Sequence, residues 1–168
     1  MSKQTKPSGT SSNPNVLSVK HMAFAVRNAE KSLEAYSNFL CVPVDTQIIE
    51  YAKSRNRVAL FDLGGIEYQL CQSMDAGGRF DSWIKERGGE GLHHICYAVD
   101  DIEKALVHAQ KNGAELRGCK GCGGVMGSHP HPEGYVAFLD NDAGGIEIEF
   151  MQVYTDAELK KYEQVKGI

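Results

Sequence analysis

Short segments in which apolar and polar residues alternate recur along the chain, and this period of two predicts β-strands. The strands are expected at residues 17–26, 44–51, 57–63, 66–72, 94–99, 114–117, 135–140 and 146–152. Between the first two strands, Leu33, Tyr36 and Leu40 recur at helical spacing and predict a helix. Similar patterns predict a short helix within residues 73–90, a longer one that ends at Asn112-Gly113, and a polar one after Tyr154.

Capping residues mark where these helices begin. Asn28 is expected to be the N-cap of the first helix, because its side-chain oxygen can accept a backbone N–H. Asp100 with Glu103, and Thr155 with Glu158, have the spacing of a capping box. These pairs predict the starts of the third and fourth helices.

The pattern of strands and helix occurs twice. Superposing His21 on His94, 73 positions later, also aligns Ala25 with Ala98, Val26 with Val99 and Glu30 with Glu103. The Gly-Gly-Ile-Glu segments at residues 64–67 and 144–147 correspond as well. A repeat of this kind predicts an α+β fold in which two tandem β-α-β-β-β modules pair into an open barrel around a central cavity.

The repeat also predicts the domain organisation. We expect a disordered tail at residues 1–16, one domain at 17–153 made of module one (17–76) and module two (90–153), and a C-terminal helix at 154–168. The tail is rich in Ser, Lys, Thr and Pro and has no apolar core, which is typical of disorder and unlike a signal peptide.

The distribution of side chains over the strand faces predicts the cavity. In the first strand of each module, the face that carries the histidine otherwise holds small residues, namely Ala23, Ala25, Cys96 and Ala98. In the last strands, polar residues share one face: Glu67, Gln69 and Cys71 in module one, and Glu147, Glu149 and Met151 in module two. Since the opposite faces are apolar and suit covering helices, we expect these small, polar faces to line a cavity.

Paired histidines and oxygen donors in equivalent positions indicate a metal site. A pseudo-two-fold axis would bring His21 and His94 together with one polar residue from each last strand. Imidazole nitrogen with carboxylate or amide oxygen suits a divalent Co, Mn, Ni, Fe or Zn ion. Alternation leaves open whether Gln69 or Glu67, and Glu149 or Glu147, would be the ligands. His93 is expected to face away from its neighbour His94.

Composition excludes several classes of partner. The net charge is −4 and the isoelectric point about 5.9, so the composition gives no indication of a basic surface that would bind nucleic acid. No apolar run approaches the roughly 18 residues of a membrane span. Five cysteines in a chain of 168 residues without an export signal predict a reducing, cytoplasmic location.

The two histidine motifs carry a family resemblance. His21-Met-Ala-Phe-Ala-Val26, residues 91–102 and Ile148-Glu-Phe-Met-Gln152 resemble the motifs of the vicinal oxygen chelate superfamily, which includes glyoxalases, bleomycin-resistance proteins and dioxygenases. Within it the chain is most similar to the methylmalonyl-CoA epimerases. The likeness covers about residues 17–153.

The resemblance implies a function and assigns the ligands. It implies one divalent ion held by His21, Gln69, His94 and Glu149, an acyl-CoA substrate such as methylmalonyl-CoA, a homodimer, and proton abstraction α to a thioester carbonyl. The family pattern also implies a glutamate base, but the matching position looks like Ala59.

Other groups must then move the proton. On the strand face that carries the ligands, Glu147 and Glu67 are the catalytic candidates, with His129 or His131 reaching in from a loop. Both glutamates have an alternative role, which is to orient the metal ligands.

The loop at residues 118–134 stands outside the repeat. Cys119 and Cys122 form a Cys-x-x-Cys motif, and His129 and His131 follow closely. A second zinc site or a redox pair would use these residues. The interpretation we favour is a glycine-rich lid over the active site in which the cysteines are incidental.

Two rival functions use the same fold. One is another metal enzyme, either a glyoxalase-type lyase or an Fe(II) dioxygenase with two histidines and one carboxylate. The other is a non-catalytic protein that binds a drug or small molecule. Filled ligand positions favour an enzyme over a binding protein.

Overall fold

The structure, a computed structural model, describes residues 14–43 and 46–166, apart from the side chains of residues 141 and 142. Most of the tail expected at 1–16, the first residues of the strand expected at 44–51, and residues 167–168 of the expected C-terminal helix lie outside this part.

Most of the expected helices and strands are present. The helices are α1 (Ala29–Leu40), α2 (Arg79–Arg87), α3 (Ile102–Lys111) and α4 (Asp156–Lys166). The strands are β1 (Val16–Ala25), β2 (Ile48–Tyr51), β3 (Asn56–Leu63), β4 (Ile66–Ser73), β5 (Gly91–Val99), β6 (Leu116–Arg117), β7 (His129–His131), β8 (Gly134–Ala143) and β9 (Ile146–Val153). β7 and the short 3-10 turn Lys120–Cys122 were not expected from the sequence.

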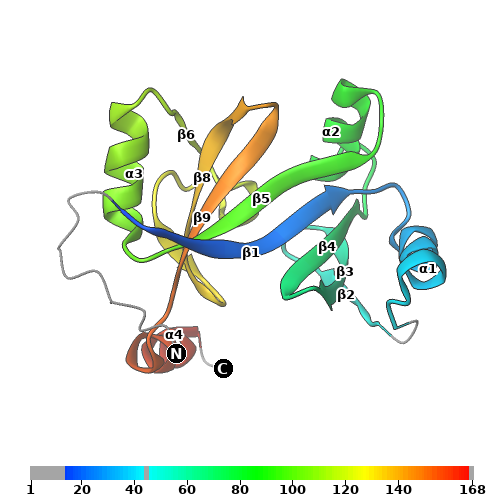
Figure 1. Cartoon of the computed structure of the whole chain (residues 1–168), viewed down its shortest axis with the longest axis horizontal. Helices are drawn as coiled ribbons and strands as arrows, with labels where there is room; N and C mark the ends of the chain where they lie inside the picture. The colour runs from blue at the N-terminus through cyan, green and yellow to red at the C-terminus, as the bar shows by residue number, and fades with distance from the viewer. Residues whose placement is uncertain (1–13, 44–45, 167–168) are drawn as a thin grey trace, which may run out of the picture.

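One mixed sheet joins the two modules through their first strands. The strand order is β2-β3-β4-β1-β5-β9-β8-β6, with β7 paired to β8. β1 runs antiparallel to β5 and parallel to β4, while β5 runs parallel to β9, so each module repeats the same arrangement about the β1–β5 pair. Figure 1 shows β1 and β5 side by side at the centre, with the two modules on either side. The predicted α+β fold of two tandem modules is confirmed, and the sheet remains open.

Helices α1 and α3 cover the apolar face of their own modules. Leu33 of α1 packs with Phe61 and Leu70 of strands β3 and β4. In module two, Leu106 of α3 packs with Leu139 of β8. Figure 1 places the two helices at opposite ends of the molecule. The apolar stripe of each helix therefore meets the apolar face of its sheet, as the alternation predicts.

The opposite face is closed at two places and open between them. Ala23 and Ala25 of β1 are fully buried beneath Phe80 and Ile84 of α2. On module two, Cys96 is buried in a cluster that includes Cys119 of the long loop. The small-residue face therefore lines a cavity only in its central part, between these two contacts. At the contacts themselves the expectation is wrong, because α2 and the long loop, which lie outside the repeat, pack on this face.

Two of the three predicted helix caps are present. The Asn28 side chain accepts a hydrogen bond from the backbone N–H of Lys31 (2.7 Å). Glu158 accepts one from the N–H of Thr155 (2.8 Å), as a capping box requires. At α3 the prediction is wrong: Asp101 is the N-cap. Asp100 instead accepts hydrogen bonds from the backbone and side chain of Asn15.

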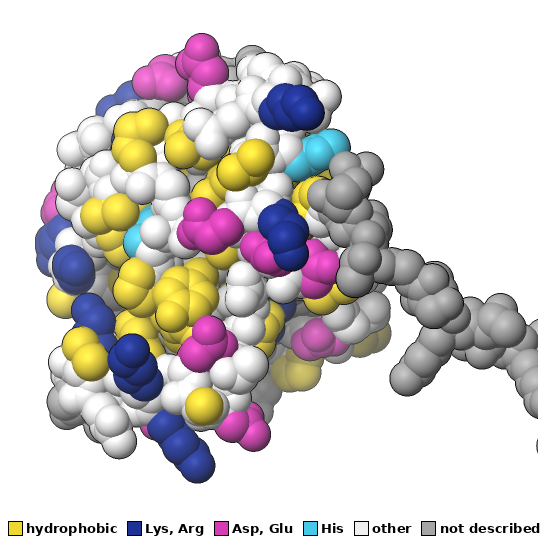
Figure 2. Space-filling model, turned by 90° about the vertical axis from the view of Figure 1, so that its left-hand side faces the viewer, with side chains coloured by type: hydrophobic (Ala, Val, Ile, Leu, Met, Phe, Trp, Pro, Cys, Tyr) yellow, Lys and Arg dark blue, Asp and Glu magenta, His cyan; other side chains and the backbone are white. Residues whose placement is uncertain are grey.

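The surface is mixed in character. On the face seen in Figure 2, Lys and Arg side chains are interspersed with acidic and hydrophobic ones. Within the described residues, the helices are too short and too polar to cross a membrane.

Candidate metal centre

Three of the four expected ligands converge on one point between the modules. The Nε2 atoms of His21 and His94 lie 3.3 Å apart, and Glu149 Oε2 lies 3.2 Å and 3.3 Å from them. Donor atoms that bind one ion at about 2.0–2.2 Å lie roughly 3 to 3.5 Å from each other. The three side chains are buried, with at most 5% of each residue exposed. Their spacing and their donor chemistry therefore fit a first-row divalent ion.

Gln69, the fourth expected ligand, comes from module one. It lines the same cavity as His21, His94 and Glu149. Its Nε2 donates a hydrogen bond to Glu67 Oε1 (2.8 Å), which directs the amide nitrogen to Glu67 and leaves the amide oxygen for another partner. Alternation left open whether Gln69 or Glu67 would be the ligand. This hydrogen bond is consistent with Gln69 as the ligand and with Glu67 as the residue that orients its amide.

The charges at this point suit a cation. Burial by itself would raise the pKa of Glu149, but hydrogen bonds from His21 and His94 and their charge lower this pKa overall. Burial lowers the pKa of His94, although Glu149 opposes the effect. Glu149 is consequently ionised near pH 7, which is the state in which a carboxylate ligates a metal.

His93 does not face away from His94 as the alternation predicted. In the β1–β5 ladder Ala23 pairs with His94 and Phe24 with Leu92, so that His93 is an extra residue in a β-bulge. The bulge turns the His93 ring inward, and its Nδ1 lies 2.8 Å from Nδ1 of His94.

Glu147 lies behind this pair of histidines. It is fully buried, and its carboxylate lies 3.0 Å from Nη2 of Arg79 and also contacts Arg117. Nε2 of His93 lies 3.6 Å from Glu147 Oε1. Burial, and next the charge of Arg79, lower the pKa of His93. His93 therefore lies between the carboxylate of Glu147 and the candidate ligand His94.

A cavity of about 450 Å³ opens beside the three converging side chains. Its wall includes titratable side chains that the sequence did not single out, namely Tyr51, Lys53, Arg79, Lys120 and Glu133. Glu67 and Glu147 are absent from the described residues that line it. Arg79 could have been noticed as a basic residue next to the packing residue Phe80 in the connecting helix. Tyr51 ends strand β2, and Lys53, Lys120 and Glu133 lie at turns, where periodicity gives no signal.

Ala59, the position expected for a general base, faces the other side of the sheet. It is fully buried in the cluster that includes Leu33 of α1. A longer side chain there would point into the helix-covered core and away from the cavity.

The long loop brings together three of its four chemically notable residues. Cys119, Cys122 and His131 form one group, with their potential ligand atoms within 4.8 Å of one another. His129 lies outside this group. Its Nδ1 is 2.9 Å from the carbonyl oxygen of Gly127, and its ring packs against Phe138.

Comparisons with known proteins agree with this architecture. The model of the Glyoxalase/Bleomycin resistance protein/Dioxygenase superfamily matches residues 20–125. The mitochondrial methylmalonyl-CoA epimerase of Homo sapiens is 27% identical over 144 residues, which cover 82% of this chain and 75% of that protein. The ethylmalonyl-CoA/methylmalonyl-CoA epimerase of Cereibacter sphaeroides is 28% identical over 136 residues, covering 80% of this chain and 97% of the other.

A solved structure supports the fold. The crystal structure of methylmalonyl-CoA epimerase from Mycobacterium tuberculosis has a TM-score of 0.66 and 18% sequence identity, and it covers 85% of this chain and 92% of its own.

Proposed function

Because this chain belongs to the glyoxalase/bleomycin resistance protein/dioxygenase superfamily, we propose that it is a metal-dependent epimerase acting on an acyl-CoA of the methylmalonyl-CoA type. The reaction would remove and return the proton α to the thioester carbonyl. The relatives named as methylmalonyl-CoA epimerases support the choice of substrate, since their similarity spans most of the chain.

The convergence of His21, His94 and Glu149 is the observation that carries this proposal. Their three donor atoms lie within 3.3 Å of one another in a buried position, and Gln69 lines the same cavity. A divalent ion held there would supply positive charge that stabilises a substrate oxygen as it becomes negative. The same donors accept Co, Mn, Ni, Fe or Zn.

Glu67 and Glu147 are better placed to position ligands than to move a proton. Glu67 holds the amide of Gln69. The carboxylate oxygens of Glu147 contact two guanidinium groups, those of Arg79 and Arg117. Through His93, Glu147 fixes the ring of His94, as carboxylates behind metal-bound histidines commonly do. We therefore assign both glutamates positioning roles.

Basic residues on the cavity wall suit an anionic substrate. Arg79 contacts Glu147 through one nitrogen and also lines the cavity, where its charge would attract the carboxylate of a malonyl group. Lys53 and Lys120 are exposed on the wall and come from opposite modules. They are placed to meet the phosphates of a coenzyme A moiety at the mouth.

Proton transfer needs groups that face the cavity from two sides. Tyr51 on module one and Glu133 on module two meet this requirement. Burial raises the pKa of Tyr51, and the charge of Glu133 raises it further. We propose them as the acid–base pair.

Isotope exchange tests the proposal directly. The metal-loaded chain should incorporate deuterium at the α-carbon of methylmalonyl-CoA in D2O, and a chelator should abolish this. His94→Ala should lose exchange, whereas His108→Ala, on the exposed face of α3, should retain it. Glu133→Gln and Tyr51→Phe should each slow exchange about 10²–10⁴-fold. Binding without exchange would instead identify a binding protein, and iron-dependent oxygen uptake a dioxygenase.

Two finer expectations belong to the same proposal. A homodimer is expected from the family resemblance, and sedimentation analysis of the full chain would test it. A cytoplasmic location follows from the five cysteines, all of which are free thiols here. Imaging of the tagged chain would test the location.

A further inference from the structure

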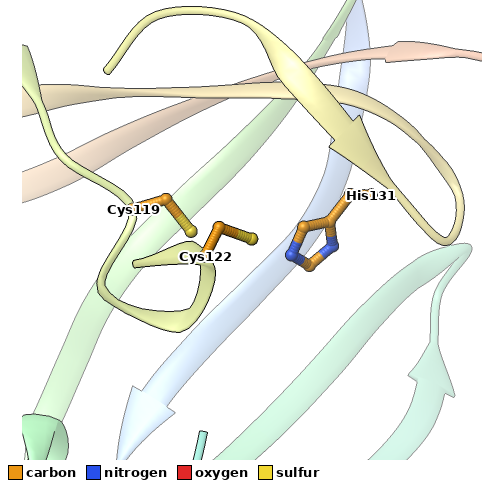
Figure 3. A group of neighbouring side chains, drawn as sticks. All are labelled: Cys119, Cys122 and His131. Carbon is orange, nitrogen blue, oxygen red and sulfur yellow. The ribbon is translucent and has the colours of Figure 1, made fainter. Parts of the chain in front are cut away.

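A second group of metal-binding side chains lies in the wall of the same cavity. Cys119 and Cys122 lie at either end of the turn Lys120–Cys122, and His131 comes from strand β7 opposite. Figure 3 shows the two sulfur atoms on the side of the turn that faces the imidazole. Their potential ligand atoms lie within 4.8 Å of one another.

The local backbone explains why both thiols point the same way. The carbonyl oxygen of Cys119 accepts hydrogen bonds from the N–H of Cys122 (3.1 Å) and of Gly124 (2.8 Å). Gly123 follows with φ 76°, a left-handed conformation that glycine adopts without strain. The chain therefore reverses tightly after the second cysteine, and the two sulfur atoms are presented together.

Part of the loop is packed against the sheet and part of it is exposed. Its apolar residues Val125 and Met126 are 43% and 59% exposed. Cys119 is buried against Val136 and Phe138. The loop has glycines and exposed side chains at positions where a packed wall would have buried apolar residues. A cross-link to β7 would therefore restrain the part of the loop that packing leaves free to move.

We propose that Cys119, Cys122 and His131 bind one Zn²⁺ ion, which clips the loop 118–128 to strand β7. Two thiolates and a neutral imidazole are the ligands that zinc prefers. On binding, the ion takes the place of the two thiol protons, which leave to solvent, so that the site is electrically neutral. Cys119 and His131 also line the cavity, so the ion would lie in its wall.

The clip would shape the entrance to the cavity. Gly121, in the turn between the two cysteines, approaches module one: a Cβ atom there would lie 3.9 Å from Cβ of Ser54. Lys120, which we place at the coenzyme A phosphates, belongs to the same turn. Fixing the turn thus fixes the wall that spans the two modules.

The third residue distinguishes this site from a redox pair. A disulfide needs only the two cysteines, which are both free thiols. The imidazole of His131 has no role in such a bond, but it supplies the third ligand to an ion. In this proposal the two cysteines are ligands, whereas the interpretation favoured from the sequence makes them incidental residues of a lid.

Cobalt substitution tests the site on the full chain. Zinc is removed with a chelator under reducing conditions, Co²⁺ is added, and the spectrum is recorded. Thiolate bound to Co²⁺ gives a charge-transfer absorption in the near ultraviolet, whereas histidine, glutamine and glutamate do not. The expected band should therefore report a site with thiolate ligands, and substitution of Cys96, the buried thiol near His21 and Glu149, separates this site from the centre at His21 and His94.

Variants assign the band to its residues. Cys122→Ser and Cys119→Ser should abolish it and lose one bound ion per chain, and His131→Gln should weaken it. Cys96→Ser is the matched control, since Cys96 is the buried thiol near His21 and Glu149, and it should retain the band. Zinc should also slow amide hydrogen exchange in residues 118–128.

Three results would overturn the proposal. They are the absence of a thiolate band in the reduced wild-type chain, loss of the band in Cys96→Ser, and isolation of the chain with Cys119 and Cys122 joined and no ion bound. Because Cys119 is buried, Cys122→Ser and His131→Gln decide the matter if Cys119→Ser fails to fold. Failure of the epimerase proposal would leave the thiolate band unchanged.

Discussion

His93 and His94 are neighbours in the chain, yet a bulge in β5 brings their Nδ1 atoms to 2.8 Å from each other inside the protein. If Nε2 of His94 binds a metal, its Nδ1 must carry the proton and donate to His93. The remaining ring proton of His93 then lies on its Nε2 and points toward Glu147, 3.6 Å away. The positions of the protons on both histidine rings are thereby defined.

Replacing His93 should weaken metal binding without changing a ligand. In His93→Phe the ring still fits between Phe80 and Trp83, but His94 loses its hydrogen-bond acceptor. We expect metal affinity, measured by competition with a chelator, to fall about 10–100-fold. Trp83→Phe, which keeps the His93–His94 contact, is the control. Unchanged affinity in His93→Phe would remove the positioning role from Glu147 and His93.

The two arginines that hold Glu147 should differ in their effect on catalysis. Arg79→Met and Arg117→Met each leave the buried carboxylate with one partner, so both should lower the free energy of unfolding, at most by about 3–5 kcal/mol. Arg79 lines the cavity, and Arg117 is not among the described residues that do. Steady-state kinetics should therefore show a raised KM for Arg79→Met alone. Equal KM values would contradict substrate binding by Arg79.

The stability of the metal-free chain should decline on acidification. The pKa values of His93 and His94 are lowered from an ordinary value of 6.5, mainly by burial. Below pH 6.5 the unfolded chain takes up protons that the folded chain does not, so stability is lost as the pH falls. Each residue contributes up to about 1.4 kcal/mol per pH unit. Urea titrations at pH 7.5 and 5.5 should show this loss, with a smaller one in His93→Phe.

Two glutamines should stabilise the two modules equally. Gln72 accepts a hydrogen bond from the N–H of Ala29 at the start of α1, and Gln152 one from Ile102 at the start of α3, both at 2.9 Å. Gln72→Ala and Gln152→Ala should each cost roughly 1 kcal/mol in chemical denaturation. Gln47→Ala, at an exposed position, should cost nothing measurable. A large difference between the first two would show that the modules are not energetically equivalent.

The buried thiols should resist alkylation while the exposed one reacts. Cys41 is exposed, whereas burial raises the pKa of Cys71 from 9.0 to about 12. Iodoacetamide followed by mass spectrometry of the native chain at pH 8 should modify Cys41 and leave Cys71 unmodified. Because folding raises the pKa of Cys71, this thiol makes a contribution to stability that is fully present below pH 9. The contribution is lost as the pH rises from about 9 to 12. Rapid modification of Cys71 would show that module one opens locally.

The sequence by itself determined the two-module fold and most of the residues of the candidate metal centre. The repeat that sets His21 on His94 fixes which strands are equivalent, and alternation fixes which side chains share a face. These are local, periodic properties of the chain, so His21 and His94 could be expected to meet one acidic residue of the last strand. Alternation left Glu149 and Glu147 open and the family resemblance pointed to Glu149, which the structure brings to the two histidines.

Only the tertiary structure decided what surrounds that centre. A β-bulge inserts an extra residue and interrupts the alternation of side chains, so the alternation predicted the wrong face of the strand for His93. The positions of Arg79 and Cys119 in the cavity wall depend on how α2 and the long loop fold over the sheet. Both segments lie outside the repeat. The roles of Glu67 and Glu147 depended on their partners, which come from other elements at contact distance. No spacing along one strand encodes such partners.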